Sequence, residues 1–270
     1  MRVNIRKLNL ILTERLKVRD LDSLGVEVQQ ATAALLVRRH LAMKSLEQQG
    51  GDALQAMIRR QVDLHATEAR RRGSDLQRQA KQRMADEKSL IADIAWQTAW
   101  SQYLKSRLTA ENLRLYFERN RNRFDGSRWE VSQIFVKMDT HDPESVQLAE
   151  QHLMELASQI RSSAGPGAEA FSQAAREHSD SGSASSGGMV GWVSKAGDLP
   201  REVMNAVRGT SAGGMTQPVR SALGMHLVFV HRHEPGDLTF DALADQAQLR
   251  RDAADALFDA LVAQQQDAKV

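Results

Sequence analysis

The stretch from His178 to His233 is the part of the chain in which residue types follow one another as they would in a binding site. It begins with a loop rich in serine and glycine and ends with an apolar run that predicts a buried strand. Ser181 in the loop and His226 in the last strand are expected to flank one apolar hollow. A hydroxyl and an imidazole in that position could form hydrogen bonds to a bound molecule.

Short motifs occur in this stretch in a fixed order. They are Ser179-Asp180 with Ser183-Ala184, Gly187-Gly188-Met189-Val190-Gly191-Trp192, Pro218-Val219, and Gly224-Met225-His226. In order and spacing these motifs resemble the signature of the parvulin (rotamase) family of peptidyl-prolyl cis-trans isomerases. The resemblance runs from roughly Trp129 to His233, and it says less about the rest of the chain.

The resemblance implies a proline pocket above a polar floor. The pocket would be lined by Val190, Leu199, Val203 and Met189, and the catalytic floor would contain His226, Gln133, Ser181 and Ser221. Gln133 stands where the family has a histidine, and Val203 stands where a phenylalanine is usual. Because glutamine can donate and accept hydrogen bonds as neutral imidazole does, a Gln133–His226 pair is expected to hold the floor together.

The implied reaction is rotation about X-Pro peptide bonds, which takes tens to hundreds of seconds without a catalyst. It needs an apolar pocket, exclusion of water, and hydrogen bonds that favour the twisted amide, but no bond breaks. The sequence therefore implies an isomerase or foldase acting on unfolded or exported proteins, without metal, nucleotide or organic cofactor. Two alternatives are a weak or inactive parvulin-fold chaperone that binds unfolded peptide segments, and a structural helical protein with a decayed isomerase insert.

Composition limits the classes of partner. The 270 residues include 36 Lys+Arg and 34 Asp+Glu, a formal net charge of +2, so no nucleic-acid partner is expected. The chain has no cysteine, which excludes disulfides and thiolate nucleophiles. No apolar run approaches the ~18 residues of a membrane-spanning helix. The oligomeric state is not predicted.

The first residues bear on the compartment. The apolar run Leu8–Leu12 is shorter than the ~7–15 residues of a secretory core, so no export signal is expected and the chain is cytoplasmic as written. The family resemblance instead implies the cell envelope or periplasm if the amino terminus is a trimmed one.

Residues 1–125 contain no proline, which favours long helices between the glycines Gly25, Gly50-Gly51 and Gly73. Asp52 and Thr109 are expected to cap helices. The helix that follows Thr109 is similar to the linker helix of SurA-like envelope foldases, which implies that residues 1–125 are a chaperone-like module. The alternative is a helical bundle or a dimerisation arm.

Residues 126–235 are expected to form an α+β domain. The order of elements is strand, helix, helix, loop, strand, helix, strand, strand, with helices packed on a mainly antiparallel four-stranded sheet. Residues 236–270 are expected to form a carboxy-terminal helix that Thr239 caps and that packs on the amino-terminal module.

Overall fold

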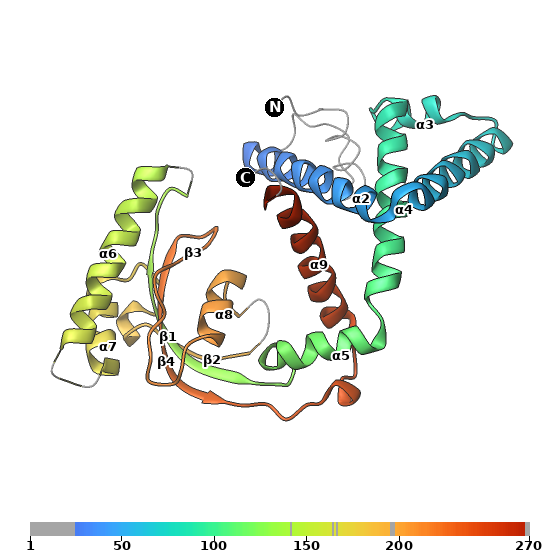
Figure 1. Cartoon of the computed structure of the whole chain (residues 1–270). Coiled ribbons are helices and arrows are strands. Elements are labelled where there is room, and N and C mark those ends of the chain that lie inside the picture. Colours follow the sequence, from blue (N-terminus) through green and yellow to red (C-terminus); the bar gives the residue numbers. More distant parts are fainter. Residues whose placement is uncertain (1–24, 141, 164, 166, 195–197, 268–270) are drawn as a thin grey trace. The chain divides into compact units, whose positions relative to one another are not determined.

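The structure is a computed structural model that describes residues 25–140, 142–163, 165, 167–194 and 198–267 (Figure 1). The chain divides into two compact units, one made of the residues up to Leu115 and from Gln246 onward, the other of Tyr116–Asp245. The expectations for the first 24 residues, including the absence of an export signal, lie outside the described residues. The domain limits expected near residues 125 and 235 stay predictions.

The first unit is helical. It contains α2 (Val26–Arg71), α3 (Leu76–Gln82), α4 (Glu87–Arg107) and α9 (Ala247–Asp267). Helices distant in sequence share one core, in which Leu46 of α2, Trp96 of α4 and Leu261 of α9 are buried together. The Ser45 hydroxyl donates a 2.7 Å hydrogen bond to the Leu261 carbonyl, which ties α9 to α2.

The prediction that Asp52 caps a new helix is wrong. Helical residues continue through Asp52, and the break is a kink at Gly51, whose φ of 49° and ψ of −143° lie outside the helical region. Glycine adopts positive φ without a Cβ clash, so the chain bends there and the helix resumes at once. The Thr109 prediction is confirmed, because its hydroxyl accepts a 3.2 Å hydrogen bond from the Asn112 N–H at the start of α5 (Ala110–Arg119).

The second unit is an α+β domain. Its elements are β1 (Arg128–Val136), α6 (Pro143–Ser162), α7 (Gly167–His178), β2 (Met189–Val193), α8 (Arg201–Arg208), β3 (Val219–Arg220) and β4 (Met225–Glu234). The strands form one sheet in the order β2-β1-β4-β3, with every pairing antiparallel. The fold class predicted from the sequence is confirmed.

The sheet is buried on both faces, as Figure 1 shows, with α6 and α7 on one face and α8 on the other. Alternate residues of a strand point to opposite faces. Ile134 of β1 therefore joins the core under α6 and α7, whereas Val131 joins Val203 of α8 and Val228 of β4 on the other face. Gln133 has the same alternation as Val131, so the α8 side of the sheet is the side on which a site can form.

The predicted start of the carboxy-terminal helix is also wrong. Thr239 precedes a short 3-10 turn, Phe240–Ala242, and makes no capping hydrogen bond, while α9 begins only at Ala247. Phe240 explains the difference, because its buried ring lies 6.1 Å from that of Phe117, edge to face. A tertiary contact of the turn thus overrides the local capping signal.

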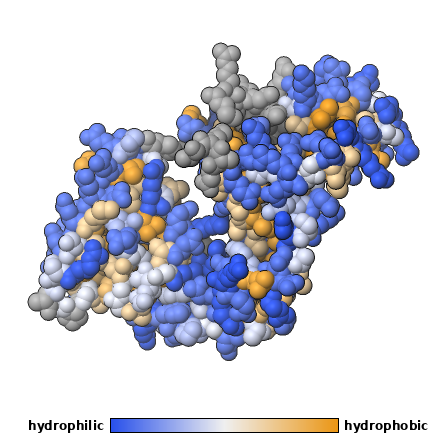
Figure 2. Space-filling model, in the orientation of Figure 1, coloured by the Kyte–Doolittle hydropathy of each residue, from blue (hydrophilic) through white to orange (hydrophobic). Residues whose placement is uncertain are grey.

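No helix among the described residues is long and apolar enough to cross a bilayer. The face drawn in Figure 2 is mainly hydrophilic, with small separate hydrophobic patches.

Candidate functional site

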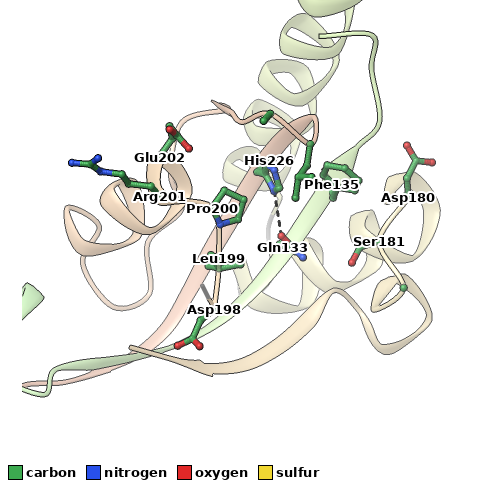
Figure 3. A pocket seen from close by; sticks show the side chains of 13 residues that line it. Gln133, Phe135, Asp180, Ser181, Asp198, Leu199, Pro200, Arg201, Glu202 and His226 are labelled. Atoms are coloured by element: carbon green, nitrogen blue, oxygen red, sulfur yellow. Dashed lines mark hydrogen bonds between the residues drawn. The ribbon is translucent and has the colours of Figure 1, made fainter. Parts of the chain in front are cut away.

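A hollow of about 670 Å³ opens on the α8 side of the sheet (Figure 3). It is formed by β1, the loop after α7, the start of α8 and the segment that leads into β4. Its lining residues are Gln133, Phe135, Asp180, Ser181, Gly182, Asp198, Leu199, Pro200, Arg201, Glu202, Ala222, Leu223 and His226. The hollow thus combines an apolar wall with polar and charged groups, and concave sites for peptides and small molecules have both kinds of surface.

Three polar side chains form a continuous hydrogen-bonded row in this part of the unit. The Ser221 hydroxyl lies 2.8 Å from Nε2 of His226, and Nδ1 of His226 lies 3.3 Å from Oε1 of Gln133. His226 and Ser221 are buried, with 3% and 6% of their surface exposed, and Gln133 is half-buried. The structure therefore brings three of the four predicted floor residues together.

Burial determines the protonation of the row. Removal from water disfavours a charged imidazole, and it lowers the pKa of His226 from 6.5 to about 4. The imidazole is neutral at pH 7, so the floor of the hollow is polar but uncharged.

Ser181 lines the hollow but stands outside this row. Its hydroxyl oxygen lies 3.0 Å from that of Ser183 and also accepts a hydrogen bond from the Ser183 N–H. These are the contacts of a loop-stabilising serine.

The Ser179-Asp180 pair joins the loop to the end of β1. The Ser179 hydroxyl accepts from the Phe135 N–H, and the Asp180 N–H donates to the Phe135 carbonyl at 2.7 Å. The Asp180 carboxylate accepts from the Lys137 N–H at 2.8 Å. Both residues thus satisfy backbone groups on the edge of β1 that lies beyond its pairing with β2, and they hold Phe135 at the rim of the hollow.

Gly188, the second glycine of the pair before β2, lies very close to the backbone of Gln133. Its φ is 78°, its carbonyl accepts a 2.8 Å bond from the Gln133 N–H, and a Cβ on it would lie 2.4 Å from the Gln133 carbonyl oxygen. Only glycine allows the loop to approach β1 so closely. The motif therefore fixes the backbone of Gln133 itself.

Gly224 has the corresponding role before β4. Its φ is 151°, and a Cβ would lie 2.5 Å from the Val136 carbonyl oxygen and 2.7 Å from the Phe135 ring. The close approach places His226 beside Phe135, and the centres of the two rings are 4.9 Å apart.

The four residues expected to line the proline pocket lie in different surroundings. Leu199 lines the hollow. Val203 is fully buried in the core under α8, and its side chain is closed to a ligand. Met189 and Val190 are 44% and 36% exposed on β2, and neither is among the lining residues of this hollow.

Phe135 and Pro200 supply apolar surface that the sequence analysis did not assign to the site. Phe135 could have been found, because it lies two residues after Gln133 in a strand and so shares its face. The charged residue Asp198 precedes α8, Arg201 and Glu202 are the first two residues of α8, and no local pattern marks them.

Comparison with known proteins agrees with this geometry. Residues 134–232 match the sequence model of the Rotamase family, described as the PPIC-type PPIASE domain. The Chaperone SurA proteins of Ralstonia nicotianae and Chromohalobacter salexigens are 38% identical over 78 residues and 36% identical over 98 residues. These segments are 29% and 36% of this chain, but only 16% and 22% of the relatives.

A solved chain described as one of two structurally related SurA-like chaperones of Campylobacter jejuni is 16% identical to this chain, with a TM-score of 0.36. The alignment covers 98% of this chain and 92% of that chain. The family match lies wholly in the second unit and includes Leu199, Ser221 and His226. Residues 134–232, less than half of the chain, thus match the sequence model of a PPIC-type peptidyl-prolyl isomerase domain, and part of the chain is similar to the SurA chaperones.

Proposed function

We propose that this protein is a foldase that catalyses cis-trans isomerisation of X-Pro bonds in unfolded polypeptides. The observation that carries the proposal is the apolar hollow of Phe135, Leu199 and Pro200 beside the neutral row Ser221–His226–Gln133. The substrate class is a proline-containing, unfolded segment, and the relatives named Chaperone SurA support a role in folding. By the same resemblance we propose the cell envelope as its compartment.

The geometry suits the chemistry of amide rotation. A planar amide carries charge separation through resonance, and the twisted amide loses it, so an uncharged and water-poor surface favours the twisted form. The proline ring would lie against the apolar wall formed by Leu199 and Phe135. Gln133, held in place by the imidazole of His226, would then supply a hydrogen bond that holds the peptide while the bond rotates.

The test is the rate of exchange between cis and trans Ala-Pro in a short peptide, measured by NMR with the full chain. We expect acceleration by the wild type and a loss of at least about tenfold in His226→Ala, because one missing hydrogen bond to the floor costs on the order of 1.4 kcal/mol. Ser181→Ala is the matched control in the same hollow. Its rate should stay within about twofold, because the Ser181 hydroxyl bonds to Ser183.

A second function has its own support. The rim and wall of the hollow could bind peptide without catalysis, and the similar SurA proteins are named chaperones. In one outcome, the peptide shifts the resonances of Phe135 and Leu199 while its own cis-trans exchange rate stays at the uncatalysed value. That result would reject the isomerase and favour the peptide-binding chaperone. A wild type that neither binds nor isomerises the peptide would reject both.

A further inference from the structure

The hydrogen-bonded row at the floor of the hollow has a direction, and its first link is set by the backbone. The Leu223 N–H donates to the Ser221 hydroxyl oxygen at 3.0 Å. A backbone N–H can only donate, so the serine oxygen is an acceptor in this contact. The hydroxyl also has a hydrogen of its own, which needs an acceptor.

Two acceptors compete for that proton. Nε2 of His226 lies 2.8 Å from the Ser221 oxygen, whereas the Gly224 carbonyl oxygen lies 3.4 Å from it. The first distance is the usual one for a strong hydrogen bond, and the second is at the outer limit. The geometry therefore gives the Ser221 proton to Nε2, which must be the unprotonated nitrogen of the ring.

The second link follows from the neutral ring. A neutral imidazole carries one hydrogen, so an accepting Nε2 leaves that hydrogen on Nδ1. Nδ1 then donates to Oε1 of Gln133 at 3.3 Å. The low pKa of His226, about 4, agrees with a ring that has no second proton at pH 7.

The last link determines what the hollow offers to a ligand. With its oxygen bonded to His226, the Gln133 amide turns its nitrogen away from the imidazole, as Figure 3 shows. Among the described residues, no hydrogen-bond partner of this nitrogen is found, and Gln133 lines the hollow. An amide nitrogen has two hydrogens and no acceptor capacity.

The reverse direction has a different consequence. If Nε2 carried the hydrogen, the Ser221 proton would have to pass to the Gly224 carbonyl at 3.4 Å, and Nδ1 would need a donor from Gln133. The amide would then turn its oxygen to the hollow. The two directions thus present opposite groups to a bound peptide, a donor in the first case and an acceptor in the second.

We propose that Ser221 is a positioning residue that holds His226 as the Nδ1–H tautomer, and that Gln133 consequently donates its amide N–H to a carbonyl oxygen of the bound peptide. The inference rests on the proposed function for the identity of the ligand, but the direction of the row does not depend on catalysis. It makes Gln133 a donor with a fixed orientation, whereas a histidine at that position could present either a donor or an acceptor.

The direct test is the tautomer of His226 in the full-length, ¹⁵N-labelled protein at pH 7, read from the two ring-nitrogen shifts by long-range ¹H–¹⁵N correlation. We expect the pattern of Nδ1–H with an unprotonated Nε2. Ser221→Ala should shift it toward the other tautomer or an average, and Ser221→Thr, which keeps the hydroxyl, should restore it. An Nε2–H ring in the wild type would overturn the proposal, whether or not the protein is an isomerase.

A binding test examines the donor itself. In Gln133→Glu at pH 7 the carboxylate can still accept from Nδ1 but has no hydrogen for the peptide. We expect an uncharged, capped Ala-Pro peptide to bind about tenfold more weakly in an NMR titration, the effect of about one hydrogen bond. Gln147→Glu is the matched control, because it makes the same change at an exposed position of α6 that does not line the hollow.

The control should change the peptide affinity by less than about threefold, since a surface charge affects an uncharged ligand weakly. Unchanged or tighter binding to Gln133→Glu would mean that the peptide needs no donor from residue 133, and the proposal would be wrong. If the wild type has the predicted tautomer and binds the peptide as expected but does not accelerate its isomerisation, only the proposed function is rejected.

Discussion

Replacing Gly188 by alanine is expected to destabilise the second, α+β unit by about 3 kcal/mol or more. Part of the cost is the backbone, because an L-residue at a φ of 78° loses about 1–2 kcal/mol relative to its allowed regions. The rest is a collision of the new Cβ with the Gln133 carbonyl oxygen, 2.4 Å away. That oxygen belongs to a central strand, so relief requires a shift of β1 or of the loop and strains the 2.8 Å bond between the two residues.

The measurement is hydrogen exchange of the β1 and β4 amides in the full chain, which gives the free energy of local or global opening of the unit. Gly182→Ala is the matched control. It lies in the same loop, is exposed, and has open space around its Cα with no positive φ. Equal protection in both variants would show that the loop gives way without cost and that the glycine pair does not fix the position of Gln133.

The glycine pair also shows how far a sequence can specify this unit. Close approach of two backbone segments needs a residue without a Cβ, and such positions can be recognised in the sequence as glycines that stand between apolar runs. The strands around Gln133 and His226 are likewise visible as apolar runs of the right length. The α+β class and the order of its elements follow from these local signals, and the structure confirms them.

What local signals miss depends on contacts distant in sequence. Val203 has the expected place in its helix, but whether it meets a ligand or the core depends on how closely α8 packs on β4, and it is fully buried there. The delayed start of α9 depends on Phe240 packing against Phe117. The His226–Gln133 bond of the row joins residues 93 positions apart in sequence, so it follows from the β1–β4 register that pairs Phe135 with His226.

Acidification is expected to lower the unfolding free energy of the second, α+β unit through His226. Its pKa is about 4 in the folded protein and 6.5 without burial, so the unfolded chain takes up the proton more readily than the folded one. The contribution is complete above pH 6.5 and is lost as the pH falls from 6.5 toward 4. The stability lost between pH 7 and pH 4 is about 3 kcal/mol, because each pKa unit is worth about 1.4 kcal/mol.

The measurement compares the unfolding free energy at pH 7 and pH 4 in the wild type and in His226→Gln, which keeps a polar side chain without a titrating ring. Other groups also titrate in this window, including His231, whose pKa burial lowers, and they act in both proteins. The loss on acidification should therefore be about 3 kcal/mol smaller in the variant. His178→Gln, at an exposed position on α7, is the control and should lose as much as the wild type.

A loss of equal size in the wild type and His226→Gln would mean that the imidazole is already protonated, or freely hydrated, in the folded protein at neutral pH. A charged ring would have hydrogens on both nitrogens and could not accept from Ser221. The same pH series thus tests the neutral floor on which the amide chemistry depends. Stability of the fold and direction of the hydrogen-bonded row have one physical origin, the burial of His226 between β1 and β3.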